Sequence, residues 1–160
     1  MHKFWSWYER HYTLNVTTAA ILFTLQIVHL YWLTTHVVPF RLFNLDLFSP
    51  SPFWELIIIF VDYTEIPAII MVSLVYINDL RKKFNFKSLL YLLFLDIQLL
   101  HIFWITDEFV LETFIEEVGG TILPAWLAWV AILIDYLELP VIFETIKKAF
   151  IQIEKNFLKD

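Results

Sequence analysis

The sequence VDYTEIP at positions 61–67 recurs as IDYLELP at positions 134–140. Asp, Tyr, Glu and Pro keep the same spacing in both copies, inside segments that are otherwise almost wholly apolar. Carboxylates are rare in such segments because removing a charge from water costs free energy. The repeated pair therefore predicts a functional site, and the apolar segments around it predict the fold that encloses the site.

The composition indicates a membrane protein. Of the 160 residues, 59% are hydrophobic and 19% aromatic, only two are glycine, and the mean hydropathy is +0.67. A water-soluble domain of this length has too little interior to bury that much apolar surface. The lipid bilayer is the solvent that fits this composition.

Four continuous apolar stretches cover most of the chain, at 16–39, 54–78, 88–111 and 122–146. Each is long enough for a membrane-spanning helix, which takes about 20 residues. None shows the alternating pattern of a membrane β-barrel. We therefore expect an all-α integral membrane protein with a single membrane domain at 1–160, folded as a bundle of four transmembrane helices.

A second repeat accompanies the first. QIVHLYWLTTHVV at 26–38 aligns with QLLHIFWITDEFV at 98–110, with identical Gln, His, Trp, Thr and final Val. The offset is 72 residues here and 73 residues for the acidic elements. We expect a tandem-duplicated helical hairpin, with repeats at 16–79 and 88–148 related by a pseudo-two-fold axis along the membrane normal.

Basic residues predict the orientation. Ten of the eleven lie before the first stretch, between the second and third, or after the fourth, and only Arg41 lies elsewhere. The positive-inside rule then predicts a multi-pass protein of the cell membrane with both termini cytoplasmic. Residues 1–15 are expected to lie along the inner membrane surface, 149–160 to form a cytoplasmic tail, and acidic residues to crowd the outer face.

Polar residues of all four stretches reach one depth. With a rise of about 1.5 Å per helical residue, two histidines and four carboxylates lie roughly 12–16 Å below the outer surface. Each Asp and Glu of one copy share a helix face because they are three residues apart. The six residues are His29, Asp62, Glu65, His101, Asp135 and Glu138.

These six residues predict a dinuclear metal site. Carboxylates and imidazoles bind iron, manganese, zinc or copper, and two divalent ions would offset the repulsion among four buried carboxylates. Iron is the first choice. The number of ligands resembles that of ferritin-like bundles, but their Glu-x-x-His motif is absent and no residue role is transferred. Gln26 and Gln98 are expected to orient the histidine rings, and Tyr63 and Tyr136 to act catalytically beside the carboxylates.

Other interpretations stay open. The polar residues can be interhelical hydrogen bonds without further function, His29 and His101 can bracket a haem b, or the acids can relay protons, with Asp96 marking a route toward the cytoplasm. In size, intramembrane acids and prolines the chain resembles the sterol isomerase and sigma-2 receptor group, without a specific shared motif. That resemblance implies metal-free acid–base chemistry on a lipid double bond, or lipid binding.

The leading functional expectation is an oxidoreductase acting on a lipid-soluble substrate, with the alternative of a non-catalytic subunit of a larger membrane complex. Whether the chain is an enzyme stays open at this stage. Expected partners are a lipid or lipid-soluble small molecule, the membrane, and a complex partner or a second copy in a homodimer. The net charge of −6 and the scattered basic residues give no sign of nucleic-acid binding. The chain has no cysteine, which excludes disulfides and thiol chemistry.

Overall fold

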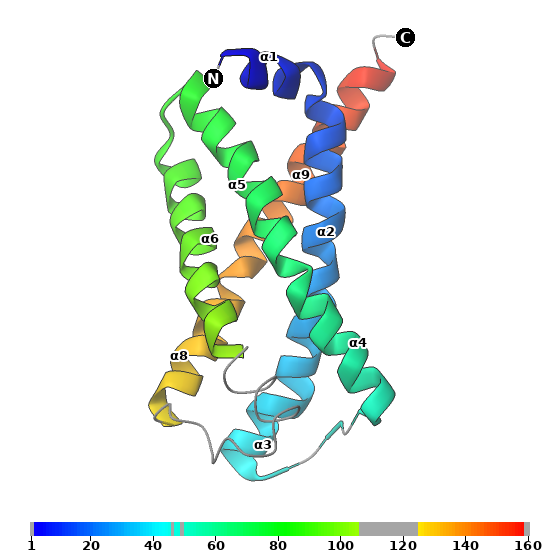
Figure 1. Cartoon of the computed structure of the whole chain (residues 1–160), viewed down its shortest axis with the longest axis vertical. Helices are drawn as coiled ribbons and strands as arrows, with labels where there is room; N and C mark the ends of the chain where they lie inside the picture. The colour runs from blue at the N-terminus through cyan, green and yellow to red at the C-terminus, as the bar shows by residue number, and fades with distance from the viewer. Residues whose placement is uncertain (1, 46, 49, 106–124, 159–160) are drawn as a thin grey trace.

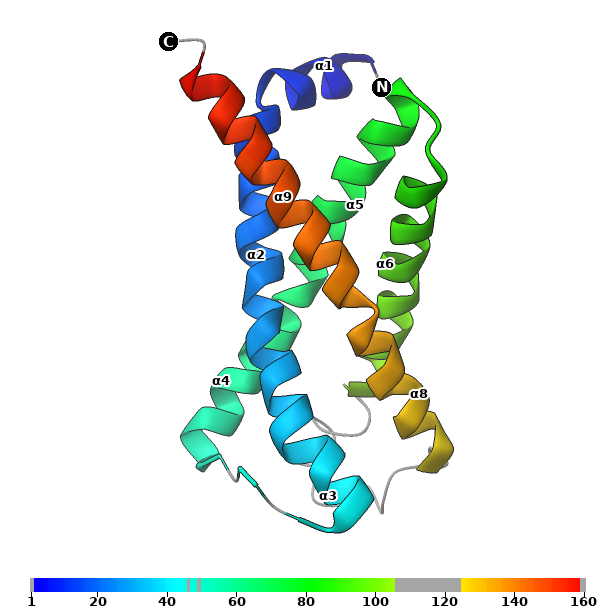
Figure 2. The ribbon, with the colours of Figure 1, turned by 180° about the vertical axis from the view of Figure 1, so that it is seen from behind.

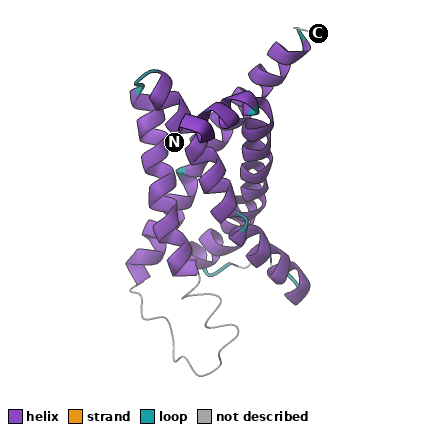
Figure 3. Ribbon diagram, turned by 45° about the horizontal axis from the view of Figure 1, so that its top comes forward, coloured by secondary structure: helices purple, strands orange, loops and turns teal. Residues whose placement is uncertain are grey.

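The computed structural model describes residues 2–45, 47–48, 50–105 and 125–158. Within these residues the chain is helical, with short connections and no strand (Figure 3). In chain order the elements are α1 (His2–Arg10), α2 (Tyr12–Trp32), the π-helical turn η1 (Leu33–Val37), α3 (Val38–Phe43), α4 (Pro52–Tyr63), α5 (Glu65–Lys82), α6 (Phe86–Ile105), α8 (Ala125–Tyr136) and α9 (Glu138–Phe157). The expectation of an all-α fold is confirmed for the described part of the chain.

The first apolar stretch forms one long rod from α2 through η1 to α3. Pro39 has no N–H to donate to the preceding turn, and that turn widens so that Val38 donates to the carbonyl of Leu33. The rod ends at Asn44, which adopts a left-handed conformation (φ 53°) that asparagine tolerates better than most residues.

Both acidic elements break their helices at the same position. Thr64 separates α4 from α5, and Leu137 separates α8 from α9. Their backbone angles nearly coincide, at φ −70° and ψ −11° for Thr64 and φ −68° and ψ −15° for Leu137. Each donates its N–H three residues back, to Val61 and Ile134 respectively, and each lies three residues before a proline. The prolines remove the next helical hydrogen bond and thereby favour the break.

The helices pack as a bundle around α2. Helix α2 runs along both α5 and α9, whereas α6 packs against α5 and α8 and touches α9 only sparsely (Figures 1 and 2). The core is formed by small and branched side chains from α2, α5 and α9, such as Ala19, Ala68 and Val141, all fully buried. Small residues let helix backbones approach closely, as they do in membrane bundles.

Both termini lie at one end of the bundle, which we call the terminal end, and α1 crosses it (Figure 1). Ion pairs join helices there: Lys148 with Asp79, and Lys87 with Glu144 at 2.7 Å. The opposite end carries α3 and its Arg41 (Figure 2). The grouping of basic residues at one end, expected from the sequence, is therefore seen in the described part of the chain.

The outer surface of the bundle is strongly apolar. Large hydrophobic side chains such as Ile21, Phe60 and Phe143 are at least 61% exposed. Two helical runs, Tyr12–Phe43 and Pro52–Lys82, are long and apolar enough to cross a membrane. The first part of the expected tail is helical, because α9 continues as a regular helix to Phe157. Asn156 there donates a hydrogen bond to Thr13 at 2.8 Å, which ties the end of α9 to the start of α2.

Candidate functional site

The centre of the candidate site is His29, which lies between two aspartates. Its Nδ1 is 2.6 Å from Oδ1 of Asp62, and its Nε2 is 3.4 Å from Oδ2 of Asp135. All three residues are buried, with exposed fractions of 6%, 7% and 3%. The two aspartates occupy equivalent positions of the two DYxExP elements. Copies that lie 73 residues apart in the chain therefore meet at one imidazole.

Two glutamates form a second contact in the same region. Glu65 and Glu138 are both buried, and their carboxyl groups interact electrostatically with one another. Two ionised carboxylates repel one another, and burial strengthens that repulsion. The buried Gln98 of α6 interacts with Glu138 as well. The site thus consists of an Asp–His–Asp arrangement and a neighbouring pair of buried glutamates.

The helix breaks explain how the carboxylates reach the interior. Each aspartate lies two residues before its break, at the end of α4 or α8, and each glutamate is the first residue of α5 or α9. Gln26 supports the first break, because its Nε2 donates to the carbonyl of Val61 at 3.3 Å and to Oγ1 of Thr64 at 3.2 Å. The expectation that Gln26 orients a histidine ring is therefore wrong: it braces the backbone between Asp62 and Glu65.

Electrostatics make the His29 contacts mutually dependent. A buried carboxylate without a partner is strongly disfavoured, and a protonated imidazole between two carboxylates compensates both of them. The 2.6 Å contact of Nδ1 with Asp62 is the closer of the two, and Nε2 hydrogen-bonds to Asp135 on the other side. Contacts at both nitrogens hold the ring between the two carboxylates.

The two tyrosines lie beside the site in different surroundings. The hydroxyl of Tyr136 lies 2.7 Å from Oγ1 of Thr34 in η1, which in turn donates to the carbonyl of Leu30 at 2.7 Å. Tyr63 is 37% exposed. Thr34 was not among the expected site residues, although the sequence contained a signal. It belongs to the segment 26–38 that aligns with 98–110, and there it aligns with Thr106. A π-helical turn is itself common at functional sites.

Several expected site features fall outside what the structure describes. His101 lies in α6, but its side chain is not among the described residues. The acidic residues expected at the outer face, Asp46, Asp107, Glu108, Glu112, Glu116 and Glu117, are also outside them. Asp96 is described, and its side chain is exposed on the outer surface of α6. The expectation that Asp96 begins a proton route inside the bundle is therefore not supported.

The described residues contain no preformed metal centre. Among the described residues, no group of three or more His, Cys, Asp or Glu side chains has an arrangement that would hold a metal ion. In the observed geometry both ring nitrogens of His29 face carboxylates, and Asp62 takes up Nδ1. A site with His29 as ligand therefore has only Nε2 to offer, on the side of Asp135.

Comparison with known proteins found no relative: no family model, no curated protein and no solved structure matches this chain.

Proposed function

We propose that this protein is a four-span integral membrane protein whose His29–carboxylate cluster performs acid–base chemistry on a lipid-soluble molecule. The membrane part of the proposal is supported by the two long apolar helical runs, the apolar outer surface and the basic residues gathered at the terminal end. Such a distribution suits helices that contact lipid along their length and water at their ends.

The proposed architecture includes a duplicated hairpin. Support comes from the two helix breaks, which fall at equivalent positions of the two DYxExP elements and have nearly the same backbone angles. Further support comes from the pairing of equivalent residues, because Asp62 and Asp135 contact one histidine and the carboxyl groups of Glu65 and Glu138 interact with one another. A pseudo-two-fold axis along the membrane normal would bring equivalent side chains together in this way.

The observation that carries the chemical proposal is the position of His29 between two aspartates from different helices. A histidine whose ring is fixed on one side by a carboxylate can take up and release a proton on the other side. The neighbouring buried glutamates, Glu65 and Glu138, would supply the second proton-carrying group. An acid and a base in one buried place are what the migration of a double bond requires: one carbon gains a proton while another loses one.

Deuterium incorporation tests this reaction on a mixture of lipids, so that no single substrate has to be chosen. Purified protein in nanodiscs would be incubated with total membrane lipid extract in D₂O, and lipids would be analysed by mass spectrometry. We expect at least one lipid class to gain carbon-bound deuterium with the wild-type protein, and the gain to disappear in Asp62→Asn. Asp79→Asn is the matched control, since Asp79 pairs with Lys148 far along α5 from the cluster. Equal incorporation with wild type and Asp62→Asn would contradict the proposal.

A dinuclear or mononuclear metal site is a second candidate function, favoured by two observations. Glu65 Oε1 and Glu138 Oε1 are buried and have no hydrogen-bond partner among the described residues. In addition, 3.4 Å between Nε2 of His29 and Oδ2 of Asp135 is a separation that two ligands of one ion would show. Asp62 would then orient the ring from outside the metal shell instead of binding the ion.

Metal content separates the two candidates. The protein would be purified in mild detergent without chelators and analysed by elemental mass spectrometry, with iron as the first metal sought and manganese, zinc and copper beside it. About one or two equivalents of one metal, lost in His29→Ala and kept in Asn15→Ala, would favour the metal site. Absence of metal from folded wild-type protein, together with deuterium incorporation, would favour acid–base chemistry. Asn15 serves as control because it is a buried polar residue of the same helix that bonds elsewhere, to the carbonyl of Tyr8.

A further inference from the structure

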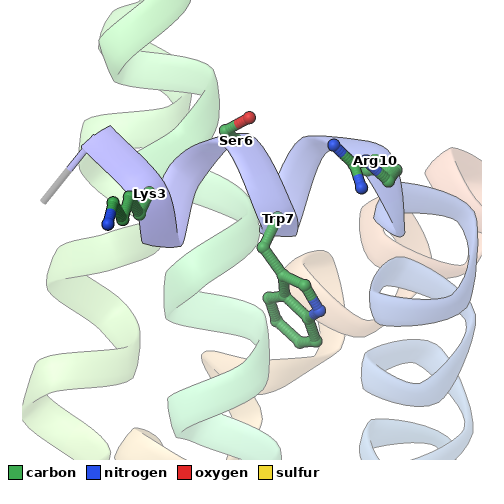
Figure 4. Close-up of a pocket in the computed structure, with 4 residues that line it drawn as sticks. All are labelled: Lys3, Ser6, Trp7 and Arg10. Carbon is green, nitrogen blue, oxygen red and sulfur yellow. The ribbon is translucent and has the colours of Figure 1, made fainter.

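Helix α1 presents four residues around a hollow at the terminal end of the bundle. Lys3, Ser6, Trp7 and Arg10 are spaced at three, four and seven residues, which places them along one helix face. They line a hollow of about 450 Å³, shown in Figure 4. Two cations, a hydroxyl and an indole ring therefore surround one space.

The opposite side of α1 is what holds this helix to the bundle. Tyr8 is 1% exposed, and the guanidinium of Arg81 lies 4.0 Å from the ring centroid of Trp5. Glu9 faces Lys82 at 3.8 Å. These contacts fix α1 across the end of the bundle, and none of them uses the four residues of the hollow. The fold thus leaves that face available.

Among the residues that the structure describes, no acid forms an ion pair with the two cations of the hollow. Lys3 and Arg10 are both exposed. Both cations add to the positive potential of this face, which favours an anionic ligand. Phosphate groups are bound by this combination of Lys, Arg and a hydroxyl donor.

The geometry suits one anionic group held from both sides. Lys3 and Arg10 are two turns apart, about 10 Å along the axis, with Ser6 and Trp7 between them. In Figure 4, Lys3 and Arg10 lie toward opposite ends of α1 with Ser6 and Trp7 between them, and the indole of Trp7 points from α1 toward the level of the helices of the bundle. Trp7 is 51% exposed and, with Phe4 at 44%, offers apolar surface where an acyl chain would continue from a headgroup.

We propose that this hollow binds the phosphate of an anionic phospholipid headgroup, with the acyl chains descending past Trp7 along the bundle. The inference rests on the proposed membrane insertion, and it is independent of the chemistry proposed at His29. A phospholipid fits better than free phosphate because the same four residues provide both the cations and an exposed indole.

Native mass spectrometry of the full chain in detergent tests the proposal. Delipidated protein would be titrated with phosphatidylglycerol, phosphatidylcholine or inorganic phosphate. We expect retention of phosphatidylglycerol above phosphatidylcholine, and a Lys3→Ala/Arg10→Ala double variant should bind phosphatidylglycerol roughly 30-fold more weakly. The matched control is Lys147→Ala/Lys155→Ala, which removes the same charge from exposed positions on α9 and should keep the binding.

Three results would overturn the assignment. Equal weakening by both double variants would show unspecific attraction to a basic surface. Equal retention of the two lipids would show that no headgroup charge is read. Binding of inorganic phosphate that phosphatidylglycerol does not displace would assign the hollow to a free anion. Circular dichroism checks that the variants fold, and alkaline carbonate extraction of cell membranes checks insertion separately, so that failure of the membrane proposal is recognised as such.

Discussion

His29 shows how strongly one side chain at the centre of this molecule depends on its partners. Its two nitrogens face Asp62 and Asp135, and none of the three residues has access to enough water to replace a lost contact. Removing one partner of a buried charged set leaves the others uncompensated, which costs more than the intact set contributes. Stability and function are therefore expected to change together at this residue.

Replacing His29 with Ala should lower the free energy of unfolding by about 3–5 kcal/mol, because two buried carboxylates lose their common partner. The measurement is reversible unfolding in mixed micelles, followed by circular dichroism. His36→Ala is the control, since His36 belongs to the same rod but lies in η1, seven residues beyond His29. A loss no larger than that of the control would indicate that the aspartates are already protonated and need no imidazole.

At the scale of elements, helix α1 should detach at high pH. Burial raises the pKa of the Tyr8 phenol, so its neutral form is favoured when α1 is docked. The docked state therefore binds the proton more tightly than the undocked state. Its stability is complete below a pH of about 10, the ordinary pKa of tyrosine, and falls as the pH rises beyond it.

Hydrogen exchange of the α1 amides, measured as a function of pH and corrected for the intrinsic exchange rate, checks this expectation. Protection of α1 should decrease above the ordinary tyrosine pKa in the wild-type protein. In Tyr8→Phe, which keeps the ring and removes the titrating group, the decrease should be smaller. The same pH dependence in both proteins would assign the effect to other groups.

Helix α6 carries a carboxylate on its exposed apolar surface, where an acid is unusual for a helix that contacts lipid. Asp96 is exposed in the middle of this apolar helix, between the exposed Leu93 and Leu99. If α6 spans the membrane, Asp96→Leu should raise the free energy of unfolding by up to about 3 kcal/mol, because an acid at mid-membrane is costly. Thermal unfolding in nanodiscs measures the change, with Ser88→Leu as a control at a buried position that should be destabilised. A destabilised Asp96→Leu protein would indicate that a partner molecule binds this acid.

The sequence predicted the helices but not all of the side-chain contacts between them. Apolar runs and repeats led to the helices, to the meeting of Asp62, Asp135 and His29, and to the proximity of the two glutamates. Spacing along one chain does not determine which side chains touch. That is why the bracing role of Gln26, the Thr34–Tyr136 contact and the outward position of Asp96 required the structure.

At the scale of the whole molecule, the absence of cysteine from the chain makes its orientation directly measurable. We expect Asn85→Cys, in the connection from α5 to α6, to react with an impermeant maleimide only after the cell membrane is opened. Ser51→Cys, which precedes α4 at the opposite end, should react in intact cells. This pattern follows from the basic residues at the terminal end. Labelling of both positions in intact cells would contradict four spans with cytoplasmic termini.

The two helix breaks have a mechanical consequence. Thr64 lies between Asp62 and Glu65, and Leu137 lies between Asp135 and Glu138. Each joint therefore has an aspartate on one arm and a glutamate on the other. Any bend at these joints turns the arms that carry the aspartates relative to the arms that carry the glutamates. A tilt of α4 or α8 at the far end of the molecule would therefore change the separation between the aspartates, with His29 between them, and the two glutamates.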